Sequence, residues 1–244
     1  DEFKKLGLVD IASYKSYIDQ FHRAENPKTP TPEEIALFNP DAIDNRAFWE
    51  AAEEVFQTDP VANCMYTKPL SKMDGNRRNL NLYKLNGFIA AIECWLGYGA
   101  NTNLLEIGPG YGAFKSWAEV NTGFNYFGAD VYPKSEGVDA TETNGLLAPI
   151  SKSRTYRAVI SSNVFQHLSL NQRRAYYKDV CDILEPGGLF MVSMCFDNLA
   201  PDSPYRDSNG KIWLKHYGQF TEIQNRNDIL DDLLPLFEIY IENR

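Results

Sequence analysis

The stretch LLEIGPGYGAF, residues 104–114, decides the fold of this chain of 244 residues. It begins as a short apolar run and continues into three closely spaced glycines, and the residues that follow resemble the start of a helix. Turns of this kind connect a buried strand to a helix, because glycine adopts backbone conformations that a side chain hinders. The stretch therefore predicts a strand, a tight turn and a helix, with a ligand held close to the backbone of the turn.

Three further apolar runs are rich in aromatic and branched residues, as short strands are: residues 124–130, 156–162 and 188–196. Helical stretches separate the runs, most clearly at residues 169–184, where Ser169 and Gln172 predict a capping box. Strands that alternate with helices form a parallel sheet with helices on both faces. We therefore predict an α/β fold with a Rossmann-like, doubly wound and mostly parallel sheet.

Two of the expected helices each have a predicted buried face. In the helix at 169–184 it consists of Tyr176, Val180, Ile183 and Leu184, and Pro186-Gly187-Gly188 is expected to end that helix. An earlier helix, ended by Gly97 and Gly99, has apolar residues at three- and four-residue spacing: Leu85, Phe88, Ile89, Ile92, Trp95 and Leu96.

Residues 1–78 predict a helical N-terminal cap, and residues 79–244 the Rossmann-like domain. After a proline-rich break, Thr31 can cap a helix that has Pro32 at its first position, and Asn39 and Pro40 repeat this device. Nothing in residues 1–70 alternates as a strand does. The region is either a lid over the site or a structural buttress, and we expect the lid.

The composition restricts the partners. The hydrophobic content of 43% suits a protein with a real core, and the net charge is −9, which disfavours a nucleic acid or an anionic membrane as the main partner. No apolar run approaches the ~18 residues of a membrane span. The cysteines lie far apart, and Cys94, Cys181 and Cys195 fall in apolar runs, which predicts reduced core thiols and a cytoplasmic protein. The oligomeric state stays open.

The glycine turn fits two kinds of ligand. Gly108, Gly110 and Ala113 match the dinucleotide fingerprint, and Asp130 follows Gly110 by about 20 residues, the spacing of an acidic residue that binds ribose hydroxyls. The same features suit S-adenosylmethionine, which is a nucleoside with an amino-acid tail. Glu106 favours the latter, because a carboxylate before the first glycine attracts an amine and repels a pyrophosphate. The long helical region before the turn also departs from a dinucleotide-binding fold.

Four segments together resemble the motifs of class I S-adenosylmethionine-dependent methyltransferases. LLEIGPGYG resembles the first motif, YFGAD the acidic end of the second strand, AVISSNVFQHL the fourth-strand motif, and LEPGGLFMV the turn before the fifth strand. The resemblance covers residues 79–244 and implies methyl transfer with S-adenosyl-L-methionine as cofactor. The chain departs from the family at its end, where FEIYIENR stands in place of one more usual strand.

The resemblance also implies which residues bind the cofactor. The glycine turn passes close to the methionyl tail, the second-strand acid binds the ribose hydroxyls, and the end of the fourth strand lines the methyl-transfer side. These roles fall to Glu106, Gly108 and Gly110 with Tyr111 as a cover, to Asp130, and to Ser162 and Asn163, with Asp139 as candidate adenine contact.

A hydroxyl acceptor requires a general base, and two histidines lie where one is expected. His167 follows the fourth strand and is either the base or a helix-initiating residue bonded to backbone. His216 follows the fifth strand, where the family builds its acceptor pocket. Trp213 and Tyr217 beside it either stack on the acceptor or pack as an aromatic patch. Asp197 is a candidate base, metal ligand or turn residue, and no second carboxylate beside it suggests a metal, so none is predicted.

A narrower resemblance, to bacterial sugar O-methyltransferases, suggests the acceptor. We expect in-line methyl transfer to a hydroxyl of a small molecule, sugar or glycan. The alternatives are N-methylation of a small amine, an NAD-dependent oxidoreductase, and a cofactor-binding scaffold without catalysis. A nucleic-acid substrate is disfavoured further, because residues 161–164 read SSNV where amino-methylating DNA enzymes have NPPY. Asp228, Asp231 and Asp232 predict an exposed helix face.

Overall fold

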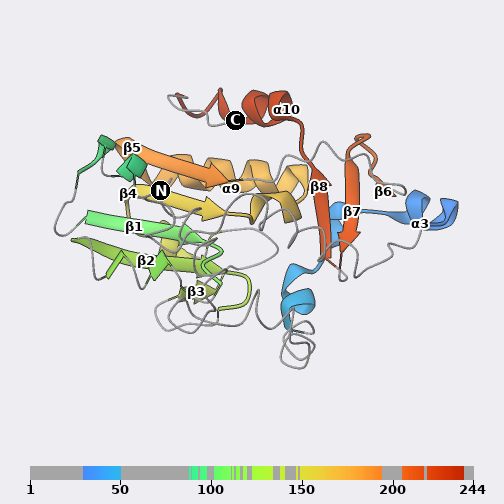
Figure 1. Ribbon diagram of the computed structural model, residues 1–244, viewed down its shortest axis with the longest axis horizontal. Coiled ribbons are helices and arrows are strands. Elements are labelled where there is room, and N and C mark those ends of the chain that lie inside the picture. The colour runs from blue at the N-terminus through green and yellow to red at the C-terminus, as the bar shows by residue number, and fades with distance from the viewer. Residues whose placement is uncertain are drawn as a thin grey trace, which may run out of the picture.

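The computed structural model describes residues 30–50, 88, 90–92, 94–97, 102–110, 112, 114–115, 118–119, 123–133, 138–140, 147, 149–193, 205–216 and 219–238. Within these ranges the strands form two sheets, a larger parallel one and a small antiparallel one (Figure 1). None of the described helices is long and apolar enough to span a membrane.

The larger sheet has the strand order β3-β2-β1-β4-β5, and all its neighbouring strands are parallel. This arrangement confirms the predicted Rossmann-like α/β fold. The strands are β1 Thr102–Ile107, β2 Phe124–Asp130, β3 Val138–Ala140, β4 Tyr156–Ser162 and β5 Leu184–Ser193.

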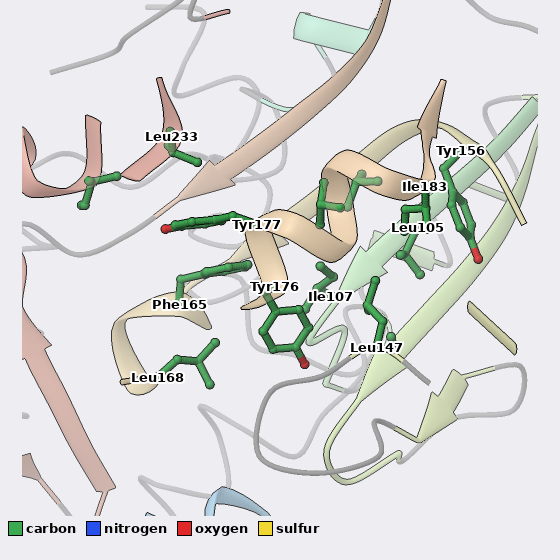
Figure 2. Packing of buried hydrophobic residues seen from close by; sticks show 14 residues of the cluster. Leu105, Ile107, Leu147, Tyr156, Phe165, Leu168, Tyr176, Tyr177, Ile183 and Leu233 are labelled. Carbon is green, nitrogen blue, oxygen red and sulfur yellow. The ribbon is translucent and has the colours of Figure 1, made fainter. Parts of the chain in front are cut away.

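Successive residues of β1 point to opposite faces of the sheet, and each face has its own core. Leu105 packs toward helix α9 (Leu170–Ile183), whose Tyr177 stacks on Phe165 with ring centroids 5.2 Å apart (Figure 2). Leu104 packs on the opposite face, against residues of the helix before β1 and of the helix after the glycine turn: Phe88, Ile92, Phe114 and Ala118. Helical segments therefore cover both faces, as predicted.

Helix α9 begins as its sequence predicts. The Ser169 hydroxyl accepts a hydrogen bond from the Gln172 amide, and the Gln172 side chain accepts one from the Ser169 amide. Tyr176, Val180 and Ile183 are buried as expected. The helix ends before the predicted stop, because Leu184 is already extended and pairs with Tyr156, so that the Pro-Gly-Gly segment lies within β5.

The described N-terminal residues also begin their helices where predicted. Thr31 and Glu34 form a capping box on α3 (Pro32–Leu37), and Asn39 caps the single 3₁₀ turn η1 (Pro40–Ala42). The helix expected to continue from Pro40 instead starts again at residue 45, after Asp44 accepts a hydrogen bond from the Ala47 amide.

The small sheet was not predicted. It consists of β6 Tyr205–Arg206, β7 Ile212–His216 and β8 Gln219–Ile223, and helix α10 (Arg226–Leu233) follows it. Figure 1 shows it beyond the arrowheads of β1, β4 and β5, with α3 on its outer side. The short helix α8 (Pro149–Lys152) precedes β4, and the 3₁₀ turn η3 (Phe165–His167) follows it.

Three expectations about exposure were wrong. Cys94 is exposed and Trp95 is 48% exposed, because the buried face of their helix is narrower than its apolar pattern and includes Phe88 and Ile92. The acidic face of α10 is not simply solvated. The side chain of Asp232 is only 6% exposed and pairs with Arg174, while Asp228 pairs with Lys211.

Candidate active site

Gly108 and Gly110 have different roles in the glycine turn. Gly108 and Gly110 both have positive φ angles, of 73° and 54°. A Cβ atom on Gly108 would lie 2.2 Å from Val164 Cγ2, so Gly108 allows the segment after β4 to pack directly on the turn. A Cβ atom on Gly110 would meet nothing within 4 Å. Gly110 is therefore the point at which a ligand can approach the backbone.

Asp130 is fixed beside this turn. Its Oδ2 accepts a hydrogen bond from the Gly110 amide at 3.1 Å, and its Oδ1 accepts one from the Tyr132 amide at 3.0 Å. These two bonds hold the carboxylate at the carboxyl end of β2, and a carboxylate oxygen can accept more than one hydrogen bond. The end of β2 thus fits the nucleoside part of the cofactor that the sequence motifs imply.

Glu106 lies at the penultimate position of β1 and is 6% exposed. The Tyr126 hydroxyl donates a hydrogen bond of 2.5 Å to Glu106 Oε2. Burial raises the pKa of Glu106 to about 7, the Tyr126 bond opposes this rise, and the nearby Asp130 charge adds to it. A carboxyl group in this state can take up a cationic ligand group at neutral pH or above, once it has lost its proton.

Ser162 and Asn163 stand where β4 ends. The hydroxyls of Ser162 and Ser193 lie 3.2 Å apart, and the Asn163 amide donates to the Ser193 carbonyl at 3.0 Å. Asn163 adopts the left-handed conformation, with φ of 59°. The next residue, Val164, is the one that packs on Gly108.

These residues meet at one place in the fold. The strand order reverses between β1 and β4, and in open α/β sheets the ligand crevice lies at the carboxyl ends of the strands at such a reversal. The structure therefore brings together six of the predicted residues there: Glu106, Gly108, Gly110, Asp130, Ser162 and Asn163.

Asp139 lies opposite Ala129, next to Asp130, but its side chain has other partners. It belongs to β3, where its carboxylate accepts a hydrogen bond from the Ser151 hydroxyl at 3.2 Å and lies 3.7 Å from the Arg154 guanidinium. These partners come from α8 and the segment before β4. Its contact with adenine stays a prediction without geometric support.

His167 is half-buried, and its imidazole lies against the backbone and a side chain of β8. Its Nδ1 lies 3.0 Å from the Phe220 carbonyl oxygen and 3.2 Å from the Thr221 hydroxyl. Burial lowers the pKa of the imidazole to about 4. A general base needs a pKa near the working pH and access to the acceptor, so this geometry favours the alternative in which His167 is bonded to backbone.

Trp213 is fully buried. Its Nε1 donates to Asp207 Oδ2 at 3.2 Å, and its ring meets Phe38 edge-on with centroids 5.7 Å apart. Phe38 also packs on Phe220. This geometry favours an aromatic patch beneath the N-terminal segment over stacking on an acceptor.

The remaining predicted residues are described in part or not at all. His216 ends β7, and its backbone pairs with Gln219. Tyr111, Asp197 and Tyr217 lie outside the described residues. No group of three or more possible metal ligands gathers within the described ranges.

Two residues of the site were missed from the sequence. Tyr126 and Val164 are ordinary members of apolar runs, and only the strand register and the turn after β4 bring them to Glu106 and Gly108. The spacing of Tyr126 from Asp130 does place both on one face of a strand, which is the one signal that was available.

Comparison with known proteins agrees with this site. Residues 71–229 match a family model described as a methyltransferase domain. Comparison with curated proteins gave no match. The solved structures that are similar to this chain include the following three. The PH0226 protein from Pyrococcus horikoshii OT3 is 14% identical, with a TM-score of 0.53 over 78% of this chain and 93% of that one.

The second structure is an S-adenosylmethionine-dependent methyltransferase from Mesorhizobium loti, 17% identical, with a TM-score of 0.41 over 60% of this chain and 78% of that one. The third is a Burkholderia thailandensis 1,6-didemethyltoxoflavin-N1-methyltransferase, 14% identical, with a TM-score of 0.48 over 86% of this chain and 82% of that one.

The family model covers well over half of the chain and includes the glycine turn, Asp130 and the end of β4. The fold and the fixed carboxylate beside the turn agree with it. The protein belongs to the class I S-adenosylmethionine-dependent methyltransferases, and its cofactor is S-adenosylmethionine.

Proposed function

We propose that the protein methylates a hydroxyl group of a small molecule, with sugars and glycans as the foremost candidates. The observation behind this proposal is the small sheet beside the carboxyl ends of β1, β4 and β5 (Figure 1). It is fastened there through His167 and the Phe220 carbonyl. Such a cover beside the site suits a small acceptor, and the net charge of −9 argues against a nucleic acid.

The chain's own residues would divide the work as follows. Bound S-adenosylmethionine supplies an electrophilic methyl group on a sulfonium sulfur. Asp130 holds the ribose of the nucleoside, and Glu106 and Gly110 receive the amino-acid tail. Ser162 and Asn163 border the acceptor side and help to orient its hydroxyl. Orientation and exclusion of water account for much of the rate enhancement in such a displacement.

His216 is the proposed general base, which takes the proton of the acceptor hydroxyl as the oxygen–carbon bond forms. It ends β7 in the small sheet, and the other predicted histidine, His167, is held by the Phe220 carbonyl. Histidine is the side chain best suited to take up a proton at neutral pH.

The test is a release assay for S-adenosylhomocysteine with a panel of sugars and small amines, on wild type, His216→Gln and His167→Gln. We expect a sugar or other alcohol to be turned over, with a rate that rises with pH as the base loses its proton. His216→Gln should lose roughly 10²- to 10⁴-fold in rate and lose that rise. His167→Gln should retain the pH profile, although it is less stable.

Turnover of amines alone, with His216→Gln as active as wild type, would contradict the proposal and favour N-methylation. An amine with a free electron pair does not depend on a base in the same way.

A further inference from the structure

The strand register brings Tyr126 of β2 to the carboxylate of β1. Tyr126 lies opposite Leu104, so Glu106 is its diagonal neighbour on the same face of the sheet. The Tyr126 hydroxyl donates the 2.5 Å hydrogen bond to Glu106 Oε2. This hydrogen bond links Glu106 to the neighbouring strand β2 at the predicted cofactor site.

The surroundings of this pair are apolar and acidic. Phe114, Ala118 and Phe124 pack on the same face of the sheet. Among the described residues, the charged groups that act on the pair are Asp130 at the end of β2 and Glu119 on the helix after the glycine turn. Lys115 is paired with Glu119 at 3.8 Å. Burial and neighbouring carboxylates therefore both favour a neutral, protonated Glu106.

Tyr126 acts in the opposite direction. Burial and the nearby carboxylates raise its pKa well above 10, so its hydroxyl keeps its proton and is a donor throughout the neutral range. A donor to a carboxylate stabilises the ionised form. The bond also fixes the orientation of the carboxylate relative to the glycine turn.

We propose that Tyr126 is a positioning residue for cofactor binding, whose hydroxyl holds the Glu106 carboxylate in the ionised and oriented form that receives the cationic end of the cofactor. The inference rests on the proposed role of Glu106 toward the methionyl tail. Tyr126 itself does not touch the cofactor. Its effect is exerted through Glu106 alone, and this gives it a signature in the pH dependence of binding.

The experiment is calorimetric titration with S-adenosylhomocysteine between pH 6 and pH 8, on wild type, Tyr126→Phe, Glu106→Gln and Tyr156→Phe. Tyr156 is the matched control. It is a buried tyrosine whose hydroxyl donates to the Ser151 carbonyl at 3.1 Å, within the core on the α9 face of the sheet.

For wild type we expect affinity to rise with pH through about 7, because Glu106 ionises there. Tyr126→Phe should bind about tenfold more weakly at pH 7 and recover part of that loss at pH 8, since its midpoint moves upward. Glu106→Gln should bind weakly with no such rise. Tyr156→Phe should have the wild-type profile, although we expect it to unfold at a lower temperature.

Wild-type affinity and an unshifted midpoint in Tyr126→Phe would overturn the proposal. A Glu106→Gln variant that binds like wild type would overturn the role of Glu106 and the inference with it. If wild type itself did not bind, the account of the cofactor site would fail as a whole. The three failures are thus distinguishable.

Discussion

At the scale of single residues, the burial of Glu106 affects the stability of the protein and, on its proposed role, the binding of the cofactor. Its carboxyl group has a pKa of about 7 in the folded protein, against 4.5 as the reference value. Between these values the folded state holds a proton that the unfolded state releases. The protonated Glu106 therefore stabilises the folded state at low pH, and this stabilisation is lost as the pH rises from about 4.5 to 7. On the proposed role of Glu106, the protein keeps an acid in an apolar place because the cofactor uses its charge.

Replacement of this charge should stabilise the protein. Glu106→Gln retains an acceptor for the Tyr126 hydroxyl and removes the ionisation. We expect its free energy of unfolding at pH 8 to exceed that of wild type by about 3 kcal/mol, because the wild-type carboxyl group, with its pKa of about 7, must ionise in a buried place. Urea denaturation at pH 8 and at pH 4 measures this difference.

The gain should be nearly absent at pH 4, where both states of the wild type hold the proton. The same gain at both pH values would mean that packing and not ionisation is the cause. A loss at pH 8 would mean that Glu106 stabilises the fold by contacts that its charge requires.

At the scale of elements, a buried ion pair joins α9 to β8. The side chains of Arg173 and Glu222 are 3% and 2% exposed. They meet through two hydrogen bonds, of 2.5 Å and 3.2 Å, and Arg173 also donates to the Leu168 carbonyl at 2.8 Å. Burial raises the pKa of Glu222, and Arg173 opposes that rise. The pair fixes the small sheet next to the residues that follow β4.

Removal of one partner should be costly, because the other charge is left buried and unpaired. Glu222→Ala is expected to lower the free energy of unfolding by about 3–5 kcal/mol, and the double change Arg173→Met with Glu222→Leu should recover most of this. The exposed pair of Arg46 and Glu50 is the control, since Glu50→Ala should cost at most about 0.5 kcal/mol. Denaturation of the four proteins decides the matter. Equal effects of Glu222→Ala and Glu50→Ala would contradict this account.

The elements also show which parts of the fold the sequence could predict. Helix α9 and the strands β1, β2, β4 and β5 were predictable, because caps and periodicity are local signals, whereas β3 has only three residues and was not predicted. The small sheet was not, since β6, β7 and β8 are short and depend on distant partners such as Phe38 and Arg173. The glycine turn and Asp130 were found from their spacing. Tyr126 was missed because the sequence of neither strand alone specifies how the two strands pair.

At the scale of the whole molecule, the described part of the N-terminal region packs against the small sheet and against the start of α9. Phe38 packs on Tyr205 and Phe220 of the small sheet. Asp41 accepts hydrogen bonds from the Ser169 hydroxyl and from Asn171, at the start of α9. Residues 30–50 thus contact the elements that surround the site, in the manner of a buttress. The expected lid function of residues 1–78 stays a prediction.

The central claim is that the glycine turn and Asp130 bind the cofactor, and one measurement tests it most directly. It is calorimetric titration of wild type, Asp130→Ala and Asp179→Ala with S-adenosylhomocysteine, with NAD as the competing ligand. Asp179 of α9 is the matched control, because it pairs with Lys152 of α8 at 2.9 Å. We predict that wild type and Asp179→Ala bind S-adenosylhomocysteine and not NAD, and that Asp130→Ala binds at least about tenfold more weakly, since a hydrogen-bonding carboxylate is lost. Unchanged affinity in Asp130→Ala, or binding of NAD in place of S-adenosylhomocysteine, would contradict the account.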